Sequence, residues 1–219
     1  MSPSAVAGAI AAIAGCAIWW LVAQLRARGE HVRALEDRIT ELLQTERTAR
    51  TDPLTSLCNR RAFVDALQKA EARSRRTGER LAVARVDIDG FKALNEAYSR
   101  TEGDQLLRAV TTSLSLTTRM GDLIARLEND EFALLLYSCG ADHAEKIGRR
   151  VVDEVAELGR AFPAARVTAS VGMACFGSPG PDPDEMMRLA GTALHAAKRT
   201  GNTVIVETDA SPSGIPAAT

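Results

Sequence analysis

Acidic residues stand at two places where a strand of this chain would end. Asp87 and Asp89 close one apolar run, and Asp130 lies in the Asn-Asp-Glu-Phe segment at 129–132, between two further apolar runs. Alternation along a strand places Asp87 and Asp89 on one face, and a tight hairpin would present Asp130. Because carboxylate oxygens hold Mg²⁺ against phosphates, the pattern predicts a metal site at Asp87 and Asp130. Solvated acids that cap turns are the alternative.

Basic side chains near these acids predict an anionic ligand. Lys92 follows a Gly-Phe turn, where backbone N–H groups and the ammonium could bind a triphosphate, with a solvated surface charge as the alternative. Arg119 and Asp122 form an Arg-x-x-Asp pair shortly before the hairpin. The guanidinium offers a donor fork to guanine or phosphate, and the carboxylate can accept from guanine. A plain surface salt bridge is the alternative for this pair.

Hydrophobic periodicity and turn residues predict the elements that would position these side chains. Asn59 can cap the first helix, and Gly78 ends it. The central order is βαββαβ with a further helix and strand, which is typical of an α+β ferredoxin-like fold and compatible with a nucleotide-polymerising palm. The predicted strands are 81–86, 123–127, 132–137, 166–175 and 203–207, and the predicted helices are 60–76, 104–118, 141–158 and 183–199.

The first 25 residues predict a membrane segment. Residues 5–25 contain no charged side chain, and as a helix they would span about 30 Å, the thickness of a bilayer core. Trp19 and Trp20 fall near the end of this run, and arginines follow it at once. The positive-inside rule then leaves residues 1–4 outside and places a single-pass protein in the inner membrane with its domain in the cytoplasm. A cleaved signal peptide is the alternative.

Residues 26–50 are nearly all good helix formers, and their apolar positions have heptad-like spacing. They predict a coiled-coil linker that would pair two copies into a homodimer; a single amphipathic helix is the alternative. The cytoplasmic domain is predicted at 51–208, followed by a disordered Ser/Pro/Gly/Ala tail at 209–219. A formal net charge of −1 over 219 residues gives no reason to expect nucleic-acid binding. The four cysteines form no CxxC pair and are read as reduced thiols.

The chain also contains a series of short motifs in a fixed order. The motifs are Asp52-Pro53-Leu54-Thr55-x-Leu57-x-Asn59-Arg60-Arg61-x-Phe63, Asp87-x-Asp89-x-Phe91-Lys92-x-x-Asn95, Gly103-Asp104-x-Leu106-Leu107, Arg126-x5-Phe132, Ser170-x-Gly172 and Ala197-Lys198-x-x-Gly201. In order and spacing they resemble the motifs of GGDEF domains, the diguanylate cyclases of bacteria. That family condenses two GTP molecules into cyclic di-GMP, with each domain of a dimer holding one GTP.

The resemblance implies a role for each matching position. Asp87 and Asp130 would bind Mg²⁺, which is needed only if GTP is still bound. Catalysis would fall to Asp130, Glu131 and Lys92, and substrate binding to Asn95 and Asp104 at the guanine and to Lys92 and Lys198 at the phosphates. A regulatory cyclic di-GMP site would comprise Arg119, Asp122 and a secondary contact from Arg150 or its neighbour Arg149.

Departures from the family pattern concentrate at the catalytic turn, where the Gly-Gly pair is Glu128-Asn129. Asn tolerates a positive φ, whereas Glu does not, and the Glu128 charge is expected to face the triphosphate. The other departures are Glu96 for Asp, Ser99-Arg100 for Gly-His, Gly191 for Asp, His195 for Tyr and Asn202 for Arg. The Arg119/Asp122 pair shows no such erosion.

Three functions follow as hypotheses. The first is a membrane-anchored, degenerate GGDEF protein with little or no cyclase activity that binds cyclic di-GMP at Arg119 and Asp122. The second is an active diguanylate cyclase that tolerates the altered turn. The third is an interaction module that binds no nucleotide.

Overall fold

A computed structural model describes residues 19–20, 24, 38 and 49–208 of this chain. The chain divides into two compact units, Met1–Ala49 and Arg50–Thr219. The predicted tail at 209–219 lies outside the described residues, and the second unit carries every predicted site.

Few residues of the first unit are described. Trp19 and Trp20 are helical, and their side chains are exposed. The predicted membrane segment at 5–25 and linker at 26–50 otherwise lie almost wholly outside the described residues. Within the described part of the chain, no helix has the length and apolar character needed to cross a bilayer.

The second unit is built on one sheet of six strands in the order β1-β3-β4-β2-β5-β6. The central pairs β3/β4, β4/β2 and β2/β5 are antiparallel, and the outer pairs β1/β3 and β5/β6 are parallel. The inner order β3-β4-β2-β5 is that of a ferredoxin-like sheet, which confirms the predicted α+β class. The strands are β1 (Cys58–Asn59), β2 (Leu81–Asp89), β3 (Leu123–Glu128), β4 (Glu131–Tyr137), β5 (Thr168–Phe176) and β6 (Thr203–Thr208).

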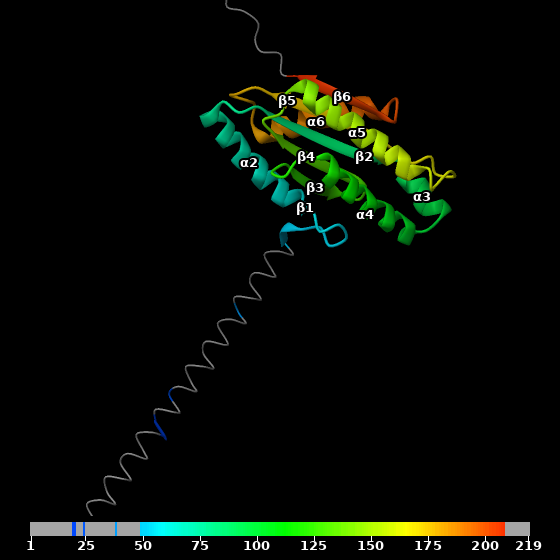
Figure 1. Ribbon diagram of the computed structural model, residues 1–219, viewed down its shortest axis with the longest axis horizontal. Coiled ribbons are helices and arrows are strands. Elements are labelled where there is room, and N and C mark those ends of the chain that lie inside the picture. The colour runs from blue at the N-terminus through cyan, green and yellow to red at the C-terminus, as the bar shows by residue number, and fades with distance from the viewer. Residues whose placement is uncertain (1–18, 21–23, 25–37, 39–48, 209–219) are drawn as a thin grey trace, which may run out of the picture. The chain divides into compact units, whose positions relative to one another are not determined.

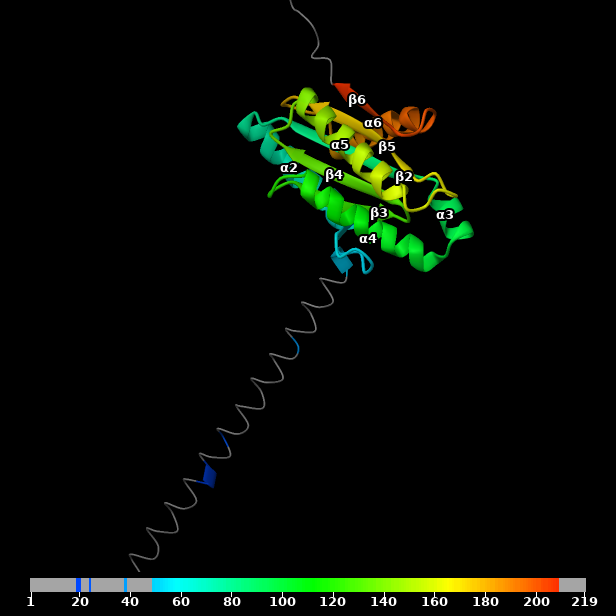
Figure 2. The same ribbon diagram turned by 45° about the vertical axis from the view of Figure 1, so that its right-hand side comes forward.

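Helices cover both faces of this sheet (Figures 1 and 2). Helices α4 and α5 lie side by side on one face, and α2 and α6 pack on the other. The short α3 continues from the end of β2 and packs against α4. The helices are α2 (Arg60–Thr77), α3 (Phe91–Ala97), α4 (Arg100–Thr117), α5 (Ala141–Gly159) and α6 (Pro183–Lys198).

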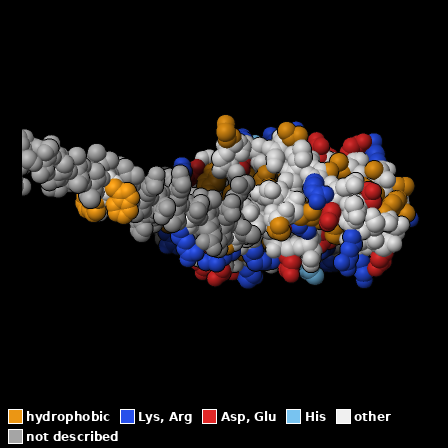
Figure 3. All heavy atoms as spheres, turned by 90° about the horizontal axis from the view of Figure 1, so that it is seen from below, with side chains coloured by type: hydrophobic (Ala, Val, Ile, Leu, Met, Phe, Trp, Pro, Cys, Tyr) orange, Lys and Arg blue, Asp and Glu red, His pale blue; other side chains and the backbone are white. Residues whose placement is uncertain are grey.

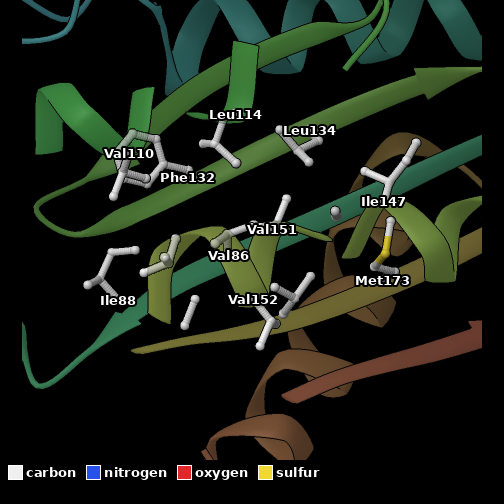
Figure 4. Packing of buried hydrophobic residues seen from close by; sticks show 14 of the residues in the cluster. Val86, Ile88, Val110, Leu114, Phe132, Leu134, Ile147, Val151, Val152 and Met173 are labelled. Atoms are coloured by element: carbon white, nitrogen blue, oxygen red, sulfur yellow. The ribbon is translucent and has the colours of Figure 1, made fainter. Parts of the chain in front are cut away.

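Two apolar clusters separate the sheet from its helices. Even-numbered residues of β2 and β4, such as Val86 and Phe132, pack against α4 and α5, where Val110 and Val151 meet them (Figure 4). Odd-numbered residues of these two strands face α2 and α6 instead, so an even or odd residue number tells which helices the side chain contacts. Asp87 and Asp89 have the odd parity, which confirms that they share one face, with Ile88 on the other.

Local signals define the helix ends, and those of α2 are the ones that the sequence predicts. The Asn59 side chain accepts a hydrogen bond from the Ala62 N–H at 3.0 Å and starts α2. Gly78 ends that helix in the left-handed conformation at φ 74°. Ser99 caps α4 by accepting from the Glu102 N–H at 3.2 Å.

Several predicted boundaries were wrong. Strand β2 runs to Asp89 rather than ending at 86, because pairing with β5 continues to that residue. Helix α4 begins at Arg100 rather than 104, since the Ser99 cap fixes its start. β5 begins at Thr168 rather than 166, because Arg166 has a left-handed φ of 50°. The sequence analysis missed β1 and α3, which are too short for a periodic pattern.

Replacing Gly172 by Ala is expected to destabilise the domain severely. A Cβ at Gly172 would lie 1.9 Å from the Leu194 backbone nitrogen, because α6 approaches β5 most closely there. Backbone cannot rotate away as a side chain can, so the loss is expected to be about 3 kcal/mol or more. Chemical denaturation measures it. Gly177→Ala is the control, since a Cβ at that position would meet no atom within 4 Å; equal losses in both variants would contradict the close approach.

Candidate functional site

The predicted metal ligands lie together where β2 ends beside the β3–β4 hairpin. The Ile88 N–H donates to the Asp130 carbonyl oxygen at 3.3 Å, which ties the hairpin turn to the neighbouring strand. Asp87 is the cross-strand neighbour of Glu131 in the β2/β4 ladder. The carboxylates of Asp87, Asp130 and Glu131 are therefore gathered at one end of the sheet.

The Asp130 carboxyl group shows that this gathering is electrostatically unfavourable. Burial raises its pKa, the charge of Asp87 raises it further, and the nearby Lys198 ammonium offsets part of the rise. A hard divalent cation between Asp87 and Asp130 would relieve the repulsion, so these oxygen donors fit Mg²⁺. Among the described residues no group of three or more His, Cys, Asp or Glu side chains could hold a metal. Two protein ligands leave room for water and phosphate oxygens.

Asp87 and Asp89 share a face but have different partners. The Lys198 ammonium, at the end of α6, lies 2.7 Å from Asp87 Oδ2. Asp89 accepts hydrogen bonds from the hydroxyls of Thr168 at 2.8 Å and Ser170 at 2.9 Å, and from the Asn202 N–H at 3.2 Å. Asp89 thus joins β2 to β5 and β6, while Asp87 is held by one cation that a metal could displace.

The altered turn keeps the backbone shape that a hairpin needs. Asn129 takes the positive φ, 40°, that the sequence analysis allowed for Asn. Glu128 remains in β3, so the steric objection to Glu does not arise. Its carboxylate lies 3.8 Å from the Arg60 guanidinium and is largely exposed. The expectation that the Glu128 charge faces a triphosphate stays a prediction; the contact in the structure is with Arg60, the first residue of α2.

The Arg126 side chain fixes the backbone of the hairpin turn through hydrogen bonds. Its Nε and Nη2 donate to the Asn129 carbonyl oxygen at 2.8 and 2.6 Å, and its Nη1 donates to Asp52 Oδ1 at 3.0 Å. Partial burial disfavours the charged form of Asp52, but hydrogen bonds from Thr55 and Arg126 outweigh it and lower the pKa of that carboxyl. The guanidinium therefore links the segment before α2 to the hairpin.

A pocket of about 800 Å³ opens on the α3/α4 side of the turn. Asn95 and Asp104, the predicted guanine-binding pair, both line it, as do Lys92 and Asp130. The Asn95 Oδ1 atom is buried and has no hydrogen-bond partner. A Cβ at Gly103 would lie 2.1 Å from that oxygen, so only glycine fits beside it. Asn95 and Asp104 place an amide and a carboxylate in one pocket, which suits the edge of a purine.

The rim of this pocket carries mixed charge. Lys92 is almost fully exposed and lies 3.8 Å from Glu96, one turn along α3. Arg100, where the family pattern has His, also lines the pocket. The face in Figure 3 likewise shows basic and acidic side chains interspersed. Asp87 and Lys198 are not in the lining, so the structure places the predicted phosphate contact Lys198 beside the pocket.

Glu131 does not enter this pocket. Its Oε1 accepts from both Nε and Nη2 of Arg85, which lies diagonally across the β2/β4 ladder on the α2/α6 face. The predicted catalytic role of Glu131 therefore has no direct support from its position. The sequence analysis missed Arg85, although a lone arginine in an otherwise apolar strand was a visible signal.

A second pocket, of about 540 Å³, lies at the opposite end of the same hairpin. Arg119 and Asp122 line it, together with Lys69 and Arg73 from α2 and the ring of Tyr137. Sequence reasoning missed the two α2 cations; their spacing of four residues puts them on one helix face, but nothing in the sequence says what that face meets. Three cations and an aromatic ring are suited to a ligand with phosphates and planar bases.

Asp122 and Arg150, the other two residues predicted for this second site, differ in where they lie. Asp122 lines the pocket and accepts from the backbone N–H groups of Arg119 and Tyr137, each at 3.1 Å, so its carboxylate also holds the loop against β4. Arg150 lies on α5, on the other face of the sheet, and does not line the pocket. Its role as a secondary contact for cyclic di-GMP stays a prediction.

Comparisons with known proteins agree with the fold and the site. Residues 49–203 match the family model described as diguanylate cyclase, GGDEF domain. The cyclic di-GMP phosphodiesterase NbdA of Pseudomonas aeruginosa is 33% identical over 201 residues, 87% of this chain and 25% of that protein. The probable diguanylate cyclase DgcT of Escherichia coli is 32% identical over 169 residues, 75% of this chain and 37% of that protein. The chain thus spans about a quarter of the first of these relatives and somewhat more than a third of the second.

Solved structures give the same result. The coiled coil and GGDEF domain of DgcB from Caulobacter crescentus, in complex with cyclic di-GMP, superposes with a TM-score of 0.74 at 32% identity. That similarity covers 83% of this chain and 98% of the DgcB chain. The diguanylate cyclase SiaD of P. aeruginosa, in complex with its activator SiaC, gives a TM-score of 0.67 at 28% identity over 93% of this chain and 81% of the SiaD chain.

Removing the charge of Asp130 is expected to stabilise the metal-free protein at neutral pH. A carboxyl whose pKa is raised on folding contributes stability below its unfolded pKa and loses it as pH rises through the folded pKa. Asp130→Asn should therefore raise Tm by about 1–2 °C at pH 7, after allowance for solvent screening. The gain should vanish below about pH 4. Thermal unfolding across this pH range checks it.

The control for this prediction is Asp153→Asn, on the exposed side of α5. It removes a carboxylate with no comparable repulsion and should leave Tm within about 1 °C. A lower Tm for Asp130→Asn than for wild type at pH 7 would contradict the repulsion between Asp87 and Asp130.

Proposed function

We propose that this chain, which belongs to the GGDEF family of diguanylate cyclase domains, is a cyclic di-GMP receptor with impaired cyclase activity. The GGDEF domain places it in cyclic di-GMP signalling. In the proposal the dinucleotide binds in the pocket lined by Arg119, and the nucleotide pocket at the hairpin turn still accepts GTP.

The cluster of cations around Arg119 carries the receptor proposal. Lys69, Arg73 and Arg119 surround one pocket of about 540 Å³ with Tyr137 beside them. Cyclic di-GMP presents two phosphates and two planar bases, which match guanidinium forks and an aromatic ring. The Asp122 carboxylate is already satisfied by backbone N–H groups. It therefore preorganises the loop that presents Arg119, and ligand binding need not order that loop.

The proposal of impaired turnover rests on the charged and polar residues at the end of the site where the phosphates would react. Glu131 is paired with Arg85, and Asn202 stands where the family pattern has a phosphate-binding Arg. Asp87 and Asp130 would hold Mg²⁺, which supplies positive charge to a triphosphate when it is bound. Lys198 would then have to leave Asp87, and its half-exposed position allows that movement.

An active cyclase is the second candidate, and specific observations favour it. Asn129 reproduces the positive φ of the turn, and the Glu128 charge is directed to Arg60. Asn95 and Asp104 line one pocket, and their amide and carboxylate suit a polar ligand. A module that binds no nucleotide would have no need for these two residues to converge.

The membrane anchor at 5–25 and the pairing helix at 26–50 belong to the proposal and rest on the sequence pattern. They would give a homodimer on the inner membrane with its domains in the cytoplasm. Cross-linking of the full chain in membranes tests both features together.

Calorimetric titration with cyclic di-GMP tests the receptor proposal. The full chain is expected to bind with micromolar or tighter Kd, and Arg119→Ala should weaken binding about ten- to a hundredfold, because a charge-assisted hydrogen bond contributes roughly 1.5–3 kcal/mol. Arg160→Ala is the matched control, since Arg160 pairs with Glu157 at the end of α5 and does not line the pocket. An unchanged Kd in Arg119→Ala, or no binding by wild type, would reject this pocket.

Titration with Mg²⁺-GTP tests the nucleotide pocket. Asn95→Ala should lower GTP affinity about tenfold or more by removing the amide acceptor, while leaving cyclic di-GMP affinity unchanged. The free energy of unfolding should not fall, because the lost oxygen has no partner in the free protein. Rapid formation of cyclic di-GMP from GTP by wild type would establish the second candidate instead.

The altered turn has its own test within that assay. Glu128→Gly with Asn129→Gly restores the family residues, and it is expected to change turnover by less than about threefold, because the Glu128 charge is directed away from the pocket and Asn129 already has the positive φ. A large recovery of turnover in the double variant would show that the turn is the cause of impairment.

A further inference from the structure

Three carboxylates and two cations share the end of the sheet behind the hairpin. Asp87 and Glu131 face each other directly across the β2/β4 ladder, an arrangement that is unfavourable for like charges. Each has its own cation: Lys198 lies 2.7 Å from Asp87, and Arg85 donates twice to Glu131. With two of the three negative charges compensated, the cluster retains one excess negative charge, and Asp130 has the raised pKa.

The two cations differ in how firmly they are held. Arg85 projects from the middle of β2, its side chain is 25% exposed, and its partner Glu131 is only 14% exposed. The Arg85 guanidinium lies over Gly191 of α6, where a Cβ would come within 2.4 Å of Nη1. Lys198 stands in the last turn of α6, and its side chain is 44% exposed. Arg85 is therefore a fixed counter-ion, and Lys198 is an exchangeable one.

Gly191 makes this arrangement possible. Any larger residue at that position would meet the Arg85 guanidinium. The pattern of the family has Asp there, which would offer Arg85 a second carboxylate. The Gly191 and Arg85 combination thus leaves Glu131 as the acceptor of the guanidinium, with Nε and Nη2 of Arg85 both directed to one of its oxygen atoms.

We infer that Arg85 is a built-in counter-ion that keeps Glu131 out of the divalent-cation site and weakens cation binding there. The inference rests on the proposed nucleotide site, because it concerns the same carboxylates. Arg85 is a positioning residue: it acts through Glu131 and touches neither nucleotide nor metal. A cation bound by Asp87 and Asp130 then meets a cluster with only one excess negative charge, because Arg85 and Lys198 compensate the other two carboxylates. This chain therefore has a lower affinity for divalent ions than the carboxylates would give without Arg85.

A purely structural ion pair gives a different expectation. In that case Arg85 would serve only to satisfy Glu131 between α2 and α6, and its loss would lower stability without improving cation binding. Removing one partner of a partly buried pair leaves the other uncompensated, so stability alone cannot separate the two roles. Cation affinity can, because the counter-ion role predicts a gain where the structural role predicts none.

The test measures Mn²⁺ binding to the full chain, without nucleotide, from the electron paramagnetic resonance signal of free Mn²⁺. Arg85→Met keeps the apolar stem and removes the charge, and it should tighten the Kd about five- to tenfold, as expected for one unit charge several ångströms away. Arg85→Lys keeps the charge and should stay within about twofold of wild type. Arg188→Met, on the exposed side of α6 and paired with Glu185, is the control for charge removed elsewhere.

Two further variants distinguish an effect of charge from an effect of misfolding. Arg85→Met combined with Glu131→Gln removes both charges, so the local charge is that of wild type, and the Kd should return to within about twofold of the wild-type value. Glu131→Gln alone leaves Arg85 without its partner near Asp87 and should weaken Mn²⁺ binding. Circular dichroism confirms that each variant is folded before it is titrated.

An equal or weaker Mn²⁺ affinity in folded Arg85→Met overturns the inference, and so does the absence of Mn²⁺ binding in every variant. Neither result decides the receptor proposal, which is judged by cyclic di-GMP affinity. That affinity should be the same in wild type and in Arg85→Met, because the Arg119 pocket lies at the other end of the hairpin. A parallel loss of cyclic di-GMP binding in all variants would point to unfolding or to failure of the receptor proposal instead.

Discussion

The guanidinium of Arg126 is the constraint on which the site geometry depends. Its side chain is 13% exposed, and it binds the Asp52 carboxylate on one side and the Asn129 carbonyl oxygen on the other. A buried guanidinium is costly unless its donors are satisfied, so both partners are fixed once Arg126 is in place. The turn then presents Asp130 toward Asp87.

Holding Asp130 close to Asp87 at the end of the sheet has an electrostatic cost. Asp130 is held where burial and Asp87 both oppose its ionisation, which is the mark of a site kept for a ligand rather than for stability. Asp89, two residues along the same strand from Asp87, has the opposite situation, with three hydrogen-bond donors around it. Neighbouring carboxylates of one face thus have different partners: Asp89 is held by hydroxyl and backbone donors, whereas Asp87 is held by the Lys198 ammonium.

The sequence was sufficient for the residues whose role follows from their own element. Asn59 as a cap and Asp87 at a strand end were predictable from local chemistry. Glu128 was judged from its charge alone, whereas its position depends on strand pairing, which includes a bulge between Arg126 and Glu128. For Asp122 the sequence suggested contact with a ligand, but it gave no sign that the carboxylate also accepts from backbone N–H groups that come together in three dimensions. Lys69 was missed for the same reason: α2 reaches the Arg119 loop only when the sheet is assembled.

The two pockets share one structural element. The β3–β4 hairpin carries Asn129 and Asp130 at its turn and Asp122 and Tyr137 at its open end. A ligand in the Arg119 pocket would contact the strand ends that Asp122 joins by hydrogen bonds. A ligand at the turn would act on the Arg126 contacts at the other end of the hairpin. Binding free energies at two sites on one rigid hairpin are reciprocal if they are coupled at all. The altered turn keeps the backbone shape of the hairpin, so to the extent that the two sites are coupled, GTP in the nucleotide pocket changes the affinity for cyclic di-GMP by the same factor as cyclic di-GMP changes the affinity for GTP.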